Sequence, residues 1–413
     1  MATVIHKRWK PRFEGASRRD RRGCSYDAYV PDPLTGWPLE IPGDLAADVA
    51  DAEMAIRDLN DTGTIHVSLE GLARFLLRAE SVASSRIEGL HAAPQRLLRA
   101  EAAIKLGGDA ADQVAVEILG NITAMETAIE SATDGGNFTG ANLLEIHKRL
   151  MDNTRLAHLG GVIRNEQNWI GGSDYNPCSA SYVPPPTEYV ADLLDDLLGY
   201  INRDDHSPLV QAAIAHAQFE TIHPFADGNG RTGRALIHVV LRRRGLAPRF
   251  VPPVSLILAT WASDYIGGLT QFRHLAPPDS TERSRSAHGW LRIFTSATRR
   301  ACSDAIRYAS DIENLEETWR MRAGRIRRDS SADRLLAILP GAPIVTVASA
   351  ADLINRSPVN TGTAINRLAK IGVLTQRNVG KERYRVFEAT GVLELFTSLE
   401  RSLASPTRNT LTS

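Results

Sequence analysis

A chain of 413 residues is longer than one hydrophobic core usually supports, so two or three domains are expected. Hydrophobic residues make up 43% of the chain and charged residues 23%, which is typical of a globular protein and excludes a disordered or collagen-like one. The 48 lysines and arginines balance the 48 aspartates and glutamates. The protein therefore does not work mainly as a polycation, and any contact with nucleic acid must be local.

The three cysteines, Cys24, Cys178 and Cys302, lie far apart in the sequence. Their spacing fits neither a disulfide scaffold nor a zinc ribbon, so we expect reduced thiols and a cytoplasmic protein. The longest uncharged stretch, residues 335–351, is interrupted by prolines and a glycine, so no membrane-spanning segment is expected.

The N-terminus is strongly basic. The first 23 residues hold eight basic residues against Glu14 and Asp20. No apolar segment follows, which argues against a secretory signal. A transit peptide stays open, but we expect an exposed basic arm over residues 1–40.

In residues 45–151 the apolar side chains recur at spacings of three and four, which is typical of amphipathic helices. Residues 158–186 differ, because their glycine pairs, Trp169-Ile170 and three consecutive prolines predict a hairpin or flap with a rigid end. Further helices are expected at residues 187–202, 208–221, 234–245 and 288–327.

The segment after residue 328 predicts a separate winged helix-turn-helix over residues 328–400. Its eight basic residues between 331 and 400 outnumber six acidic ones, and six of the eight lie on the third helix or the wing. Binding of DNA and docking of a protein both stay open. Residues 401–413 are expected to be disordered. The predicted helices span residues 332–339, 348–356 and 360–371, and the strands 373–377 and 383–387.

Residues 223–234 (HPFADGNGRTGR) combine groups that suit a nucleoside triphosphate. Gly228 and Gly230 permit a tight turn whose N–H groups form an anion cradle at a helix N-terminus. Arg231 and Arg234 are three apart, so both can reach phosphate oxygens. Asp227 is placed to hold Mg²⁺ against the same oxygens.

His223 supplies a base, because an imidazole with an ordinary pKa of about 6.5 can accept a proton from a hydroxyl. Residues 228–233 also match G-x-G-x-x-G, but a helical pattern precedes them where a dinucleotide site needs a strand. A calcium loop fails because Arg231 and Thr232 stand at its ligand and glycine positions. A plain turn would explain Asp-Gly-Asn-Gly alone, whereas the full string is more specific.

That string resembles the signature of the Fic family, helical enzymes of which most transfer AMP from ATP to a hydroxyl side chain of a target protein. The resemblance implies that His223 is the general base, that Asp227 is the metal carboxylate and that Arg234 takes the γ-phosphate. Phe225 would be a buried anchor. A glycine at position 230 favours AMP transfer over phosphate transfer. The implied ATP-binding residues are Gly228, Asn229, Gly230, Arg231, Thr232, Gly233, Arg234 and Tyr265.

Two more segments resemble parts of this family. Residues 161–164 and 167–171 resemble its flap, on which a target backbone is thought to pair, with Trp169, Ile170 and Gly171 as the implied contacts. An ordinary surface hairpin is the alternative. Tyr265 resembles a residue of the adenine pocket, although a helical tyrosine is more often packed core.

Ser84, Glu88 and Gly89 resemble the inhibitory motif of the family, in which the glutamate pairs with the second arginine of the signature. Here that arginine is Arg234. A solvated glutamate on a helix is the simpler alternative.

The sequence thus predicts a mainly α, cytoplasmic protein adenylyltransferase that uses ATP and Mg²⁺ on a hydroxyl-bearing target protein and does not enter a membrane. It would comprise a helical region at 41–135 with the inhibitory helix, and a Fic-type core with a β-hairpin flap at 136–327. An AMP-removing hydrolase, in which Glu88 positions a water, stays open. So does a DNA-binding transcription regulator with a ligand-sensing core. The target, its modified side chain and the oligomeric state, including a homodimer, stay open.

Overall fold

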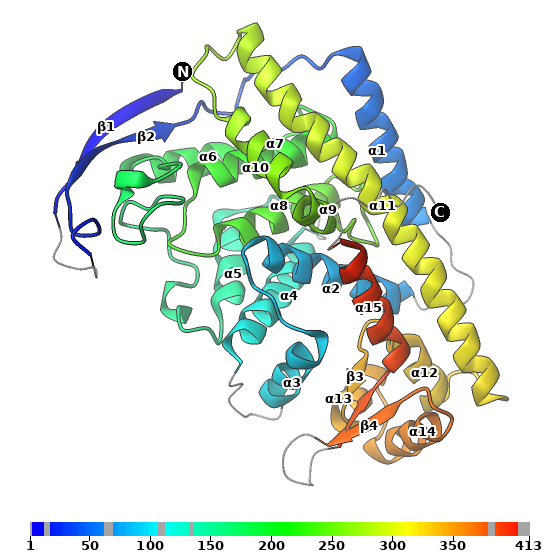
Figure 1. Ribbon diagram of the computed structural model, residues 1–413. Coiled ribbons are helices and arrows are strands. Elements are labelled where there is room, and N and C mark those ends of the chain that lie inside the picture. Colours follow the sequence, from blue (N-terminus) through cyan, green and yellow to red (C-terminus); the bar gives the residue numbers. More distant parts are fainter. Residues whose placement is uncertain are drawn as a thin grey trace. The chain divides into compact units, whose positions relative to one another are not determined.

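The computed structural model describes residues 2–11, 17–61, 69–105, 112–132, 136–378 and 385–403. These residues form mainly helices with two small antiparallel sheets, which confirms the prediction of a mainly α protein (Figure 1). The chain forms two compact units. The first comprises Met1–Glu53, Thr127–Leu246 and Ser263–Ser296, and the second comprises Met54–Glu126, Ala247–Ala262 and Ala297–Ser413.

The first unit opens with a β-hairpin. Strands β1 (Thr3–Trp9) and β2 (Cys24–Val30) are antiparallel, with Thr3 opposite Val30 and Trp9 opposite Cys24. The prediction of an exposed arm is therefore wrong for these strands. The basic residues obscured a strand pattern whose apolar members Trp9, Ala28 and Val30 are buried.

Helix α7 (Pro208–Ile222) is the centre of the first unit, and all its residues from Leu209 to Ile222 are buried. Apolar and small residues lie on every face of this helix, as expected of a helix enclosed on all sides. The polar residues among them, Gln211, His216, Gln218 and Glu220, are buried as well. Helix α8 (Asn229–Arg243) packs along it and begins five residues before the predicted start. Around them lie α5 (Gly140–Met151), α6 (Thr187–Asn202), α10 (Ala262–Phe272) and the first part of α11 (Thr281–Ala323).

The segment between α5 and α6 is the flap, defined here as residues 161–183. Single antiparallel bridges join Ile170 to Tyr182 and Ser173 to Asn176 in place of the extended ladder of a hairpin. The short helices η1 (Ala157–Leu159) and η2 (Pro177–Ser179) precede and interrupt it.

A disulfide joins Cys24 of the hairpin to Cys178 of the flap, with their Cα atoms 5.7 Å apart. The prediction of three reduced thiols is therefore wrong for this pair, because a separation of 154 residues in sequence does not limit distance in the fold. Cys302 is free and buried. The cytoplasmic location loses the cysteine argument on which it rested.

The second unit contains α2 (Leu69–Ile87), α3 (Pro94–Lys105), most of α4 (Gln113–Ser131) and α9 (Val254–Thr260), and α1 (Gly43–Asp61) ends in it. Helices α2 and α9 pack through Ala79, Ala83 and Leu256. No helix of the described residues is long and apolar enough to cross a membrane.

The C-terminal part of the second unit holds a three-stranded antiparallel sheet of order β3-β5-β4. Strand β3 and helix α15 extend the predicted pattern, and α15 includes three residues of the tail predicted as disordered. Residues 379–384, with Lys381 of the predicted wing, and residues 404–413 lie outside the described residues. The elements are α12 (Ser331–Ile338), β3 (Ile344–Val345), α13 (Val347–Ile354), α14 (Pro358–Lys370), β4 (Thr375–Asn378), β5 (Arg385–Glu388) and α15 (Thr390–Leu403).

Candidate active site

His223 ends helix α7 in the left-handed conformation, with φ 51° and ψ 60°. Its N–H still donates to the carbonyl oxygen of Phe219 at 2.9 Å, so the chain leaves the helix directly after this residue. A non-glycine residue at positive φ is uncommon and has to be held by its surroundings. The Nδ1 atom of His223 lies 3.9 Å from Oε2 of Glu220.

Arg164 of the flap supports this turn by hydrogen bonds to backbone carbonyl oxygens. Its Nε donates to the carbonyl oxygen of His223 at 2.9 Å, and its Nη2 donates to Pro185 at 2.5 Å and to Ile222 at 3.5 Å. A further bond runs from Nη1 to the carbonyl of Glu166 at 3.2 Å. Burial lowers the pKa of the guanidinium to about 10, so Arg164 stays charged at neutral pH. Two of these acceptors, the carbonyl oxygens of Ile222 and His223, lie at the C-terminal end of α7, where the helix has no N–H groups of its own to bind them.

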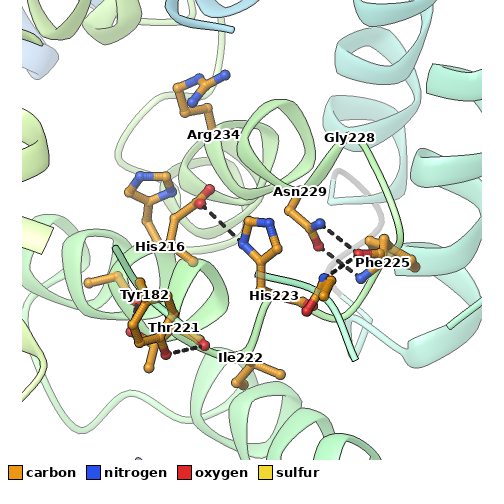
Figure 2. A network of polar contacts seen from close by, with 12 residues as sticks. Tyr182, His216, Thr221, Ile222, His223, Phe225, Gly228, Asn229 and Arg234 are labelled. Carbon is orange, nitrogen blue, oxygen red and sulfur yellow. Dashed lines mark hydrogen bonds and ion pairs between the residues drawn. The ribbon is translucent and has the colours of Figure 1, made fainter. Parts of the chain in front are cut away.

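Two further flap residues complete this support. The amide of Asn168 donates to the carbonyl oxygens of His223 at 3.2 Å and Phe225 at 2.9 Å. The hydroxyl of Tyr182 donates to the carbonyl oxygen of Thr221 at 2.7 Å (Figure 2). Sequence analysis missed Arg164, Asn168 and Tyr182 as supports of His223, although the first two lie in the segments that resemble a flap.

The loop after His223 is shaped by its own side chains. Asn229 accepts from the N–H of Phe225 and donates to its carbonyl oxygen, both at 2.8 Å (Figure 2). Phe225 is fully buried, as predicted, and stacks on His147 with ring centres 3.7 Å apart. The Asn229 side chain therefore builds the loop, and only its backbone N–H is left for a phosphate cradle.

Gly228 precedes α8 with φ 75°, a conformation that favours glycine. Asp227, just before it, accepts from the Gly228 N–H through Oδ1 at 2.7 Å, and its Oδ2 lies 3.9 Å from Nη2 of Arg231. The Asp227 side chain is 48% exposed, whereas that of Arg231 is only 5% exposed. Asp227 thus presents a carboxylate to solvent beside the N-terminus of a helix. Among the described residues, no three His, Cys, Asp or Glu side chains gather as a metal site.

The glycine at position 233 has a packing role. A Cβ atom there would lie 2.5 Å from Oε1 of Glu220 and 2.9 Å from the Phe219 ring. Gly233 therefore lies on the side of α8 that faces α7, and its lack of a side chain permits the close approach of the two helices.

Arg234 is almost completely buried, with 1% of its surface exposed. Its Nη1 donates to the hydroxyl of Tyr265 at 3.5 Å, and that hydroxyl lies 2.9 Å from Nε2 of His216. Burial and the charge of Arg234 lower the pKa of His216 to about 3, so its ring is neutral. Tyr265 is itself buried, so the geometry favours a role in positioning Arg234 over direct contact with adenine.

The predicted inhibitory segment lies at the end of α2, in the second unit. Helix α2 ends at Ile87, and Glu88 is the next residue. Gly89 has φ 78°, and the N–H of Leu90 donates to the carbonyl of Ser85 at 3.1 Å, which is how glycine commonly ends a helix. Ser84 is buried in α2. Glu88 and Arg234 belong to different units, and their pairing stays a prediction.

Residues 137–241 match the model of the family described as Fic/DOC, and residues 46–130 match the model described as Fic/DOC family N-terminal. His223 and Arg234 lie inside the first match. Both segments are thus similar to the Fic/DOC family.

Among its relatives, Protein adenylyltransferase fic-1 of Caenorhabditis elegans is 32% identical over 135 residues, which are 32% of this chain and 24% of the relative. Protein adenylyltransferase Fic of Drosophila melanogaster is 33% identical over 139 residues, 33% of this chain and 26% of the relative. The chain thus spans about a quarter of the length of these relatives. A solved Fic family protein from Desulfovibrio desulfuricans G20 is similar in fold, with a TM-score of 0.50 and 20% identity over 86% of this chain and 98% of that one.

Proposed function

We propose that this protein is an adenylyltransferase that transfers AMP from ATP to a hydroxyl side chain of a target protein. The observation that carries the proposal is the left-handed turn at His223, which lies a few residues before the N-terminus of α8. Arg164 and Asn168 hold this turn by hydrogen bonds to the His223 carbonyl oxygen. A base and an anion cradle separated by only a few residues suit the attack of a hydroxyl on a phosphate. The relatives that are named protein adenylyltransferases support this choice.

In the proposed reaction, His223 accepts the proton of the target hydroxyl while its oxygen attacks the α-phosphorus of ATP. A new bond forms between that oxygen and phosphorus, the bond from the α-phosphorus to the bridging oxygen breaks, and pyrophosphate leaves with the electron pair. The N–H groups at the start of α8 face the phosphate charge. Arg231 and Arg234 would bind the phosphate oxygens, with Arg234 on the γ-phosphate.

Asp227 fits a Mg²⁺ ion that arrives with the nucleotide, because magnesium usually takes one or two carboxylates and completes its shell with phosphate and water. The half-exposed carboxylate beside the helix N-terminus meets that description. When bound, Mg²⁺ would neutralise phosphate charge.

We also propose that Glu88 inhibits the enzyme by pairing with Arg234. An arginine engaged by a carboxylate is withheld from the γ-phosphate, and a misplaced triphosphate loses alignment with the attacking hydroxyl. The position of Glu88 at the end of a helix, fixed by the turn at Gly89, supports a defined placement of the carboxylate. A cytoplasmic location, where ATP is available, belongs to the same proposal.

The test is incubation of the protein with α-labelled ATP and a cell lysate. We expect Glu88→Gly and the isosteric Glu88→Gln to label more protein than the wild type. Glu88→Gly combined with Arg234→Ala should resemble Arg234→Ala alone, because the freed partner is absent. His223→Ala should lower transfer by roughly 10²-fold or more, whereas the exposed control His158→Ala should leave it unchanged.

Two results would contradict the proposal. Near-normal transfer by His223→Ala would remove His223 as the base. If Glu88→Gly accumulates AMP-modified protein only because its removal has stopped, as a chase with unlabelled ATP would reveal, Glu88 serves an AMP-removing hydrolase.

A further inference from the structure

The N-terminal hairpin is fastened to the flap, and both belong to the first unit. The Cys24–Cys178 disulfide joins them covalently. Ser173 of the flap donates to Oδ1 of Asp20 at 2.8 Å, and Asn176 donates to the carbonyl oxygen of the same Asp20 at 2.7 Å. The hairpin and the flap therefore form one surface.

Aromatic and backbone contacts extend this attachment. The rings of Trp9 and Trp169 meet edge to face, with centres 5.3 Å apart. The N–H of Tyr29 donates to the carbonyl oxygen of Val183 at 3.0 Å, at the far end of the flap. Trp169 is one of the residues that the family resemblance assigns to target docking, so the hairpin reaches the predicted docking segment directly.

The hairpin adds a concentrated positive charge to this surface, in a chain whose net charge is zero. Three acidic side chains near these residues have hydrogen-bond or ion-pair partners of their own: Asp20 also binds Ser17, Asp27 binds His6 and Glu188 binds Lys7. On the flap, Glu166 and Asp174 are exposed. The exposed basic residues around the hairpin tip are Arg8, Lys10, Arg18, Arg19, Arg21 and Arg22.

The same flap contacts His223 through Arg164 and Asn168. A polypeptide held by the hairpin tip would therefore lie on the structure that positions the base. The flap also exposes Val162 and Tyr175, at 52% and 45%, which suits a polypeptide with apolar side chains more than a nucleic acid backbone.

We propose that the described residues of the hairpin tip, 8–11 and 17–22, dock an acidic segment of the target protein beside the flap. The proposal rests on the proposed function for the fate of the docked segment, but the docking itself needs no AMP transfer. Clustered arginines and lysines attract an acidic partner, orient it and make its binding sensitive to salt.

The test is fluorescence anisotropy with the full chain and a labelled peptide of alternating glutamate and serine. A glutamine and serine peptide of equal length is the uncharged probe. The hairpin variant carries Arg18→Glu, Arg19→Glu and Arg22→Glu. The control carries Arg322→Glu, Arg327→Glu and Arg328→Glu, which change the net charge equally at exposed positions elsewhere. A thiol count confirms that the hairpin variant keeps its disulfide.

We expect salt-sensitive binding of the acidic peptide by the wild type and the control. The hairpin variant should bind it about ten-fold or more weakly, and the uncharged peptide should not bind. Equal affinity of the hairpin variant, loss of binding in the control, or no binding by the wild type would each overturn the proposal. Tighter, hairpin-dependent binding of a single-stranded RNA would assign the tip to nucleic acid. Labelling with α-labelled ATP, measured separately, shows whether the proposed function fails independently of docking.

Discussion

The ring of His147 donates a hydrogen bond from Nε2 to the carbonyl oxygen of Asp227, at 3.0 Å. Its Nδ1 accepts the N–H of Gly161 at 3.0 Å, which assigns the proton to Nε2. Burial lowers the pKa of His147 to about 4, so the ring is neutral at pH 7. One buried side chain on α5 thus joins the start of the flap to the loop that carries Asp227.

We expect His147 to act as a positioning residue for AMP transfer. His147→Phe keeps a ring against Phe225 but removes both hydrogen bonds, and a small shift of the loop can lower the rate by about 10²-fold. His147→Asn can still accept from Gly161, and His147→Gln can still donate to Asp227, so each should retain more kcat than His147→Phe. Steady-state kinetics with α-labelled ATP measures this. Equal loss in all three variants, with unchanged folding, would mean that neither hydrogen bond matters.

The low pKa of His147 also predicts how stability depends on pH. The folded state binds the proton near pH 4 and the unfolded state near pH 6.5, so the unfolded state holds more protons between these values. The contribution of His147 is complete above about pH 6.5 and falls by up to about 3 kcal/mol as the pH drops toward 4. His147→Asn should therefore lose less stability than the wild type over this range. Urea unfolding at several pH values measures the difference, and parallel curves would contradict it.

The parts of the fold that could be predicted from sequence are those with a strong local pattern. Helix α7 is predicted at residues 208–221 and found at Pro208–Ile222, because its apolar and small residues form a strong helical pattern. The hairpin was missed because its charges dominate its composition. His147, Arg164 and the disulfide could not be predicted, since each depends on segments that only the fold brings together.

The disulfide predicts two measurable properties of the isolated protein. Without reductant, denatured protein should expose one thiol per chain, from Cys302, and reductant should expose all three. Cys24→Ser should lower the free energy of unfolding by about 2–4 kcal/mol, because the unfolded chain gains freedom when the cross-link is absent. Cys302→Ser is the control that leaves the cross-link intact. Three reactive thiols without reductant would show that the bond does not form in solution.

We expect a substitution of Tyr265 to disturb only the placement of Arg234. Tyr265→Phe removes only the hydroxyl that accepts from Arg234 and faces His216. If Arg234 binds the γ-phosphate, the variant should weaken binding of ATP more than binding of AMP, because AMP lacks that group. Isothermal titration with both nucleotides, in a Glu88→Gly background, measures this. An equal loss for AMP would instead place Tyr265 at the adenine or the ribose.

Arg367 of α14 makes structural contacts, so its substitution would not test DNA binding alone. Its Nη2 donates to the carbonyl oxygens of Ala323 at 2.9 Å and Arg325 at 3.0 Å, at the end of α11. Arg367→Ala should therefore lower the stability of this part by about 1 kcal/mol, whether or not DNA binds. Lys370, exposed at the end of the same helix, is the better probe of DNA.

If α14 contacts a DNA backbone, Lys370→Ala should weaken binding uniformly across sequences and reduce the slope of log affinity against log salt by about one. Arg322→Ala, which removes an exposed charge from α11, should leave that slope unchanged. Electrophoretic mobility shifts of the full chain at several salt concentrations measure both. The absence of salt-sensitive DNA binding by the wild type would favour docking of a protein, because a basic helix that contacts phosphates has to release counterions when it binds.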